Sequence, residues 1–324
     1  MCRNSHDCSR LPAETTRYQP LIYQKNKSLT ELYCNGNPLK SLDLSPLTSL
    51  QRINCDSTEL DSLDLSHNKS LNILYCRHNN LSKLDLSNNT KVKLLYCADN
   101  KLPALDLSKN TLVTELDCSN NLLDSIDVSA QKSLTKLFCS SNHLTTLDVS
   151  NNAKIMRFTA ASNNLSCIDL SKQPEEMLEF DMSGNGRKIT VESEVSGSDV
   201  KYSVPLASLP TLMGEGFDLS KVASLGWMGA TIDGDVLRIT ADTVSYAYNT
   251  GYTGPTAGPA QVRFYFTYEK ENPTGVATTK ASMPVSTRYY NTLGVASDEP
   301  FPGINIVVTR YADGTTRTTK QLRK

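Results

Sequence analysis

The chain has 324 residues, with 33 basic and 34 acidic side chains and a formal net charge of −1. This length accommodates about two or three domains, and the balanced charge argues against a general binder of nucleic acid or anionic membranes. No segment approaches the ~20 consecutive apolar residues that a membrane-spanning helix needs, so we expect no membrane span. The nine cysteines are an odd number and cannot all pair within one chain.

The N-terminal flank, residues 1–28, begins with polar residues and lacks the apolar core of a secretory signal peptide. Its segment Leu21–Asn26 occupies the place of one part of the repeat that follows, and it looks like a truncated copy. We therefore expect the true start of the protein to lie upstream of this sequence.

Residues 29–185 carry a repeat of 21 residues, which recurs seven times without an insertion and ends in a decayed eighth copy. The consensus is LxxLxCxxNxLxxLDLSxNxx, as in LNILYCRHNNLSKLDLSNNTK (Leu71–Lys91). Self-similarity at a fixed period is typical of a solenoid, in which stacked coils bury a continuous core. In LxxLxC alternate residues face inward, as in a strand. We predict a mainly β solenoid of short parallel strands with little helix.

The pattern resembles the leucine-rich repeat, and the resemblance covers nearly half of the chain. In leucine-rich repeat proteins the sheet of repeat strands typically receives the ligand, which is usually a protein. Many leucine-rich repeat surface proteins of Bacteroidetes share this form of the repeat, which bears a cysteine and the LDLS stretch. The resemblance therefore implies a surface-displayed binding protein.

Six cysteines fall 21 residues apart at one inward position of the repeat, and Ala160 takes the seventh place. In-register side chains run parallel, whereas a metal or iron–sulfur site needs ligands that converge on one point. A reactive nucleophile needs exposure and a basic neighbour. We therefore expect no metal and no cofactor, and buried free thiols that act as small hydrophobic side chains. The six residues are Cys34, Cys55, Cys76, Cys97, Cys118 and Cys139.

An asparagine follows each strand, at the point where the chain must turn. An inward Asn side chain can bond to the backbone of adjacent coils, and we predict such a ladder. Thr58 interrupts it once. The column consists of Asn37, Asn79, Asn100, Asn121, Asn142 and Asn163.

Past about Gly186 the period disappears, and segments that alternate apolar and polar residues are separated by turns rich in Gly and Pro. This pattern is typical of antiparallel strands, so we predict a β-sandwich-like module over residues 186–270. Asp233-Gly234 is expected to form a hairpin turn. One short helix is expected within Leu209–Leu225, around Leu219–Leu225.

Residues 271–282 have the composition of a linker, and residues 283–324 are predicted to form a small β tail. The expected strands are Ser286–Tyr290, Ile304–Tyr311 and Thr315–Leu322, with a turn at Asp313-Gly314. The tail resembles the C-terminal sorting segments of Bacteroidetes surface proteins exported by the type IX system. The resemblance rests on an aromatic pair before Gly294, Pro302-Gly303-Ile304 before a β run, and a basic final strand.

The outward positions of the repeat strands carry aromatic residues in a row with arginine beside them, a composition that resembles interface hot spots. An alternative stays open, because aromatics on a sheet also serve to cover neighbouring strands. We take the sheet face as the candidate binding surface for a protein or a surface glycan. The candidate ligand-binding residues are Tyr33, Arg52, Tyr75, Arg77, Tyr96 and Phe138.

No nucleotide-binding, metalloprotease or nucleophile-elbow motif is present, and the four histidines are scattered. We therefore predict a non-catalytic protein. The expected function is that of a cell-surface or secreted binding protein in adhesion or host interaction, with an extracellular or outer-surface location. The alternative is an intracellular or structural interaction scaffold without export.

Overall fold

The structure, a computed structural model, describes residues 27–196, 199–223, 226–255, 257–270, 284–290, 296–297, 299, 303–311 and 316–323. The partial repeat Leu21–Asn26, the linker 271–282 and the Asp313-Gly314 turn lie outside the described residues. Of the described residues, one compact unit holds 27–192 and 202–270. A second unit holds 193–196, 199–201 and the described residues from 284 to 323.

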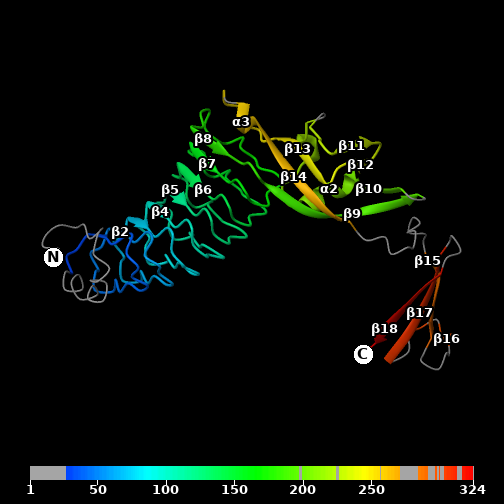
Figure 1. The fold of residues 1–324 in the computed structure, drawn as a ribbon, viewed down its shortest axis with the longest axis horizontal. Coiled ribbons are helices and arrows are strands. Elements are labelled where there is room, and N and C mark those ends of the chain that lie inside the picture. Colours follow the sequence, from blue (N-terminus) through cyan, green and yellow to red (C-terminus); the bar gives the residue numbers. More distant parts are fainter. Residues whose placement is uncertain are drawn as a thin grey trace. The chain divides into compact units, whose positions relative to one another are not determined.

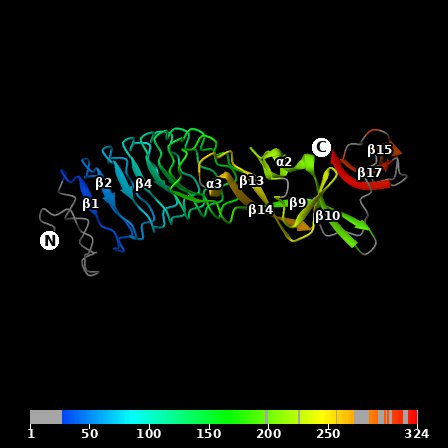
Figure 2. The same cartoon turned by 90° about the horizontal axis from the view of Figure 1, so that it is seen from above.

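The repeats form a leucine-rich repeat solenoid, as predicted from the sequence. Each coil contributes one three-residue strand, and the strands pair in parallel, in chain order, into an eight-stranded sheet (Figure 1; from above in Figure 2). The decayed eighth repeat also forms a strand, in register with the seventh. The strands are β1 (Glu31–Tyr33), β2 (Arg52–Asn54), β3 (Ile73–Tyr75), β4 (Leu94–Tyr96), β5 (Glu115–Asp117), β6 (Lys136–Phe138), β7 (Arg157–Thr159) and β8 (Glu179–Asp181).

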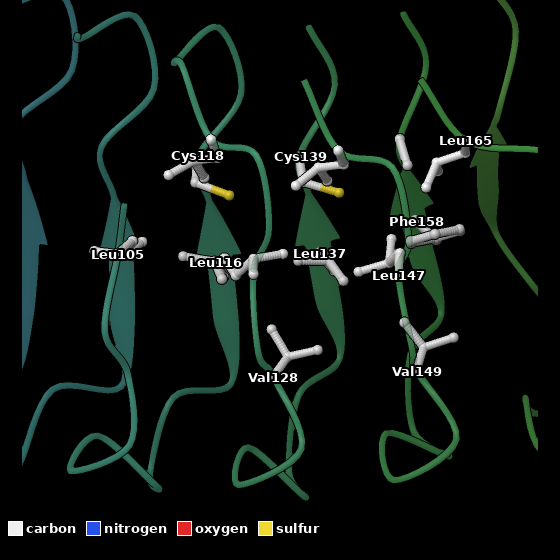
Figure 3. Close-up of a cluster of buried hydrophobic side chains, with 14 of the residues drawn as sticks. Leu105, Leu116, Cys118, Val128, Leu137, Cys139, Leu147, Val149, Phe158 and Leu165 are labelled. Atoms are coloured by element: carbon white, nitrogen blue, oxygen red, sulfur yellow. The ribbon is translucent and has the colours of Figure 1, made fainter. Parts of the chain in front are cut away.

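The middle residue of each of the strands β1–β7 is buried, because its neighbours in the strand face the opposite side of the sheet. Figure 3 shows Leu116, Leu137 and Phe158 in one such row, with Cys118 and Cys139 in the next. All six cysteines of the repeat are buried and none of them forms a disulfide, which confirms the prediction for this column. The fully buried Ala160 continues it.

The asparagine column forms the predicted ladder. The side chain of Asn100 donates from Nδ2 to the carbonyl oxygens of Cys76 (2.9 Å) and Cys97 (3.1 Å). Its Oδ1 accepts from the amide of Leu81 in the preceding coil, at 3.0 Å. The amide group of Asn100 thus joins two coils, and its oxygen gives the buried amide of Leu81 an acceptor. Where Thr58 interrupts the column, its hydroxyl donates to Cys55 O at 2.7 Å, which preserves part of the pattern.

A second ladder, which the sequence analysis missed, lies at the nineteenth position of the repeat. Asn89 donates from Nδ2 to the carbonyl oxygens of Leu65 (3.0 Å) and Asn68 (2.9 Å) in the coil before it. Leu47 holds this position in the first complete coil. The same donation recurs at Asn68, Asn110, Gln131 and Asn152.

Beyond the solenoid, the described strands form one six-stranded sheet in the order β11-β12-β10-β9-β14-β13. The sequence predicted a sandwich, but the two packed sheets of a sandwich are not found among the described residues. The reason is β9, which lies beside β10 on one side and pairs in parallel with β14 on the other. The strands are β9 (Gly186–Ser196), β10 (Asp199–Pro205), β11 (Ala230–Asp233), β12 (Val236–Ile239), β13 (Thr243–Asn249) and β14 (Gln261–Lys270), with α3 (Ala257–Ala260) before β14.

The turn and the helix of this region differ in detail from the predictions. Asp233 pairs with Val236 as the last pair of the β11–β12 hairpin, so the turn lies one residue later than expected. The helical segments are η2 (Leu206–Ser208), α2 (Leu209–Met213) and η3 (Leu219–Lys221). The helix predicted around Leu219–Leu225 is wrong at Val222, because Val222 is extended and bridges to Tyr248 on β13, while residues 224–225 lie outside the described residues.

The six-stranded sheet packs directly against the last coils of the solenoid. The hydroxyl of Tyr246, a fully buried side chain of β13, donates to the carbonyl oxygen of Ser166 at 2.6 Å. The hydroxyl of Tyr252 donates to Glu175 O at 2.7 Å. The amide of Leu170 in turn donates to Thr250 O at 2.7 Å. These bonds satisfy polar groups at the end of the solenoid that the next coil would otherwise cover.

The second unit contains a four-stranded antiparallel sheet in the order β16-β15-β17-β18. Its strands are β15 (Pro284–Tyr290), β16 (Ala296–Ser297), β17 (Gly303–Tyr311) and β18 (Thr316–Arg323). The predicted β tail is therefore confirmed, with bounds shifted by one or two residues.

Candidate ligand-binding surface

The outward face of the sheet β1–β8 carries five of the six predicted site residues. Tyr33, Arg52, Tyr75, Tyr96 and Phe138 lie on β1, β2, β3, β4 and β6, and all are partly buried. The sixth, Arg77, follows β3 by two residues. The period of two within each strand places these side chains opposite the buried leucine row.

Three of the predicted residues form one cluster. The rings of Tyr75 and Tyr96 stack, with centroids 4.9 Å apart and an interplanar angle of 15°. The Cζ atom of Arg77 lies 5.6 Å and 5.4 Å from the two ring centroids, within the range of a cation–π contact. The same guanidinium donates from Nε and Nη2 to the Asp56 carboxylate, at 3.0 Å and 2.7 Å. This hydrogen-bonded pair raises the pKa of Arg77 and fixes the side chain beside the rings.

Two further predicted residues form a smaller pair at the N-terminal end of the sheet. The guanidinium of Arg52 donates from Nη1 to the hydroxyl of Tyr33 at 3.1 Å. That hydroxyl donates in turn to Glu31 Oε2 at 3.0 Å. The hydrogen bond to Tyr33 raises the pKa of Arg52, so its charge is present throughout the physiological range.

Phe138 lies apart from the Tyr75–Tyr96 stack. In the register of the sheet, Tyr96 faces Asp117 on β5, and Asp117 faces Phe138 on β6. A whole strand therefore separates the two aromatic side chains, about 10 Å at the usual spacing of strands. The structure brings together five of the six predicted residues in two groups and leaves Phe138 outside both.

Two apolar residues of the same surface are not among the residues predicted from the sequence. Ile73 and Leu94 face each other in register on β3 and β4, next to the pair Tyr75 and Tyr96. All four side chains are partly exposed, and we call them the β3–β4 patch. The sequence sets these two residues apart, because the third position of the repeat is charged in all of the remaining coils. Those charged residues are Glu31, Arg52, Glu115, Lys136, Arg157 and Glu179.

Charged side chains border the β3–β4 patch on the side of β5. The hydroxyl of Tyr96 donates to Glu115, and this carboxylate also pairs with Lys136 at 2.9 Å. Burial acts to raise the pKa of Glu115, but the hydrogen bonds from Tyr96 and Lys136 outweigh it and lower the pKa. Burial and the bond to Glu115 raise the pKa of Tyr96. A partly buried apolar centre with a charged border has the layout of a protein interface.

The outward aspartates of the LDLS stretch serve local turns. The carboxylate of Asp64 accepts from the amide of Ser66 at 2.9 Å, and this bond lowers the pKa of Asp64. The same bond recurs in the other coils. Among the described residues, no group of three or more His, Cys, Asp or Glu side chains is placed to hold a metal ion. No helix in that part of the chain is long and apolar enough to cross a membrane.

No protein-family model matches the chain, and no curated protein matches it in sequence. Among solved structures it is similar to the functional domain of InlJ from Listeria monocytogenes, a domain that includes a cysteine ladder. The two share 20% identity over 76% of this chain and 68% of that chain, with a TM-score of 0.33.

Two other similar structures are leucine-rich repeat proteins of bacteria. The internalin InlF from Listeria monocytogenes shares 18% identity over 51% of this chain, with a TM-score of 0.46. A leucine-rich repeat protein of Leptospira interrogans shares 22% identity over 51% of this chain, with a TM-score of 0.47. The matched region spans 57% and 46% of those two chains. The solenoid fold is identified by the strands, their register and the side-chain ladders of this chain itself.

Proposed function

We propose that this protein is a non-catalytic binding protein whose repeat sheet receives a protein ligand through the β3–β4 patch. The observation that carries the proposal is the stacked pair Tyr75 and Tyr96 beside Ile73 and Leu94, which occupy a strand position that is charged in all the other coils. Aromatic and apolar side chains on a rigid surface with a charged border are typical of binding hot spots. The strands β3 and β4 are held in place because each of them pairs with a neighbouring strand on both sides.

The ring geometry favours a protein ligand over a glycan. Tyr75 and Tyr96 cover each other's ring faces in the stack, and Arg77 lies close to both rings. The hydroxyl of Tyr96 is already bonded to Glu115. A sugar ring would need an open aromatic face to pack against, whereas a protein side chain can fill the space between Ile73, Leu94 and the ring edges.

We test this with a phage-displayed library of extracellular protein fragments, selected against the immobilised full chain. The selected clones are then measured against the double variant Tyr75→Ala with Tyr96→Ala. Loss of binding in the double variant is expected, because both anchors of the patch are removed while the buried leucine row is untouched. Clones that bind both proteins equally well, or a selection that yields no clone above background, would overturn the proposal.

We further propose that the protein is displayed on the cell surface or secreted, and that residues 283–324 direct its export by a type IX system of the Bacteroidetes kind. The resemblance of the C-terminal segment supports this, as does the compact antiparallel sheet β15–β18. In a Bacteroidetes host, the chain with an added export signal should reach the cell surface, and the chain without residues 283–324 should stay in the periplasm. Equal surface display of both would contradict a role of residues 283–324 in export. Retention of both in the periplasm would favour the alternative, a scaffold without export.

A further inference from the structure

The carboxylate of Asp56 bonds both the main chain and the side chain of Arg77. Its Oδ1 accepts from the Arg77 amide at 2.7 Å, and its Oδ2 accepts from Nε and Nη2 of the guanidinium. The Asp56 side chain is only 14% exposed, against 36% for Arg77. Asp56 is itself fixed, because its amide donates to Asn54 Oδ1 at 3.1 Å and its carbonyl oxygen accepts from Gly36 at 2.8 Å. The guanidinium is therefore bound to a largely buried and ordered partner.

Arg77 stands at the edge of the ring stack. Its Cζ atom is almost equally far from the centroids of Tyr75 and Tyr96, at 5.6 Å and 5.4 Å, and the centroids are 4.9 Å apart. A guanidinium over the outer face of one ring would lie much farther from the other ring. Arg77 is therefore beside both rings at once, within reach of a cation–π contact with each.

The two rings differ in what else holds them. The hydroxyl of Tyr96 is bonded to Glu115. The hydroxyl of Tyr75 has no hydrogen-bond partner among the residues that the structure describes. The position of the Tyr75 ring therefore depends on its contacts with neighbouring side chains, Tyr96 and Arg77 among them.

The repeat itself does not require the pair of Asp56 and Arg77. Both residues hold the seventh position of the repeat, in the second and third coils, and this position is uncharged in all the other coils. The one charged pair of this column thus adjoins the coils that carry the Tyr75–Tyr96 stack. The uncharged residues of the column are Asn35, Ala98, Ser119, Ser140, Ala161 and Ser183.

We propose that Asp56 is a positioning residue for the β3–β4 patch, which through Arg77 holds the ring of Tyr75 against Tyr96 before a ligand binds. This inference rests on the proposed function. A side chain that is already fixed in the free protein loses less conformational freedom on binding, so the fixed ring raises the affinity. Asp56 acts without touching the ligand, because its carboxylate is bonded to Arg77 and its side chain is largely buried.

The first test is the affinity of a fragment selected on the full chain. Asp56→Asn keeps the shape of the side chain and removes its charge, and it should weaken binding about tenfold. Arg77→Gln should weaken binding at least as much, and Asp56→Asn should add almost nothing to it, because both changes release the same ring. The matched control is Glu179→Gln, which breaks the pair with Arg157 on the same sheet and should stay within about twofold.

The second test needs no ligand. Nuclear magnetic resonance of the full chain with labelled tyrosines reports cross-peaks between the ring protons of Tyr75 and Tyr96. These cross-peaks should be present in the natural chain and in Glu179→Gln, and they should weaken in Asp56→Asn and in Arg77→Gln. Since Asp56 acts through Arg77, the Arg77→Gln variant decides both tests if Asp56→Asn does not fold.

The outcomes separate this inference from the proposed function. Unchanged cross-peaks in both variants, or an affinity of Asp56→Asn within about twofold of the natural chain, would overturn the positioning role of Asp56. The proposed function would then stand if the fragment still fails to bind Tyr75→Ala with Tyr96→Ala. A fragment that binds this double variant as well as the natural chain would overturn the proposed function, and this inference with it.

Discussion

The free energy of unfolding should fall by several kcal/mol between about pH 7.5 and pH 9.5, measured by urea denaturation under reducing conditions. Burial raises the pKa of the thiols of Cys55, Cys76, Cys97 and Cys118 well above the ordinary value, and that of Cys139 to about 12. Because these five thiols stay protonated in the folded state, they lower its stability only at a pH at which they would ionise in the unfolded chain.

The direction follows from proton binding. In the unfolded chain a cysteine releases its proton near pH 8.5, whereas the folded chain retains it, so stability is constant below that pH and falls above it. Each buried thiol contributes a loss of about 1.4 kcal/mol for one pH unit above the unfolded pKa. Five thiols together give about 7 kcal/mol at pH 9.5, which is comparable to the whole stability of an ordinary domain.

The variant Cys97→Ala with Cys118→Ala tests the origin of this effect, because Ala160 shows that the column accepts alanine. The double variant should lose about two fifths of the pH dependence, in proportion to the thiols removed. Cys167→Ala serves as the comparison, since this thiol lies outside the column and is only partly buried. Burial also raises the pKa of Cys167, so its removal should lower the pH dependence by less than the removal of the two column thiols. A free energy of unfolding that is flat from pH 7.5 to 9.5 would contradict the burial of the thiols.

Replacing Asn100 by alanine should lower the free energy of unfolding by about 3–4 kcal/mol, as measured by urea denaturation at pH 7. The variant leaves the buried amide of Leu81 without an acceptor and removes the donor shared by the carbonyls of Cys76 and Cys97. Asn79 and Asn121 retain their own bonds to these carbonyls, so the main loss is the unsatisfied amide.

Asn88→Ala is the matched control. The Asn88 side chain is exposed, and its one bond among the described residues is to Ser87 at 3.5 Å. Its removal should change the free energy of unfolding by less than about 0.5 kcal/mol. Equal losses for Asn88→Ala and Asn100→Ala would show that the ladder does not stabilise the solenoid.

The solenoid was predictable because each of its features repeats. Seven copies in register identified the strand, the buried cysteines and the first asparagine column, since any other reading would place polar and apolar residues on the wrong faces. The second ladder was missed although its asparagine stands in the consensus. Its role depends on which carbonyl oxygens of the preceding coil lie beside it, and this requires the path of the turn.

The second half was less predictable because its pairing is not local. Alternating residues identified its strands, but the parallel pairing of β9 with β14 joins segments far apart in the chain. This pairing makes one sheet of what the sequence suggested were two. The contact of Tyr246 with Ser166 likewise depends on how the sheet packs against the solenoid.

The candidate site was only partly predictable, because its contacts depend on which side chains meet across the sheet. The outward columns identified Tyr75, Tyr96 and Arg77, but single columns do not reveal which pairs meet across the sheet. The role of Ile73 and Leu94 emerges when both columns are seen in register. The separation of Phe138 from the Tyr75–Tyr96 stack is visible in the same way.

The most direct measurement of the central claim is the affinity of one selected fragment for three proteins: the natural chain, Tyr75→Ala with Tyr96→Ala, and Phe138→Ala. Phe138 is an aromatic of the same sheet that lies outside the β3–β4 patch, so its removal controls for a general effect on the surface. The double variant should bind about thirtyfold more weakly or worse, and Phe138→Ala should stay within about twofold. Unchanged affinity of the double variant, or an equal loss in Phe138→Ala, would contradict recognition through the β3–β4 patch.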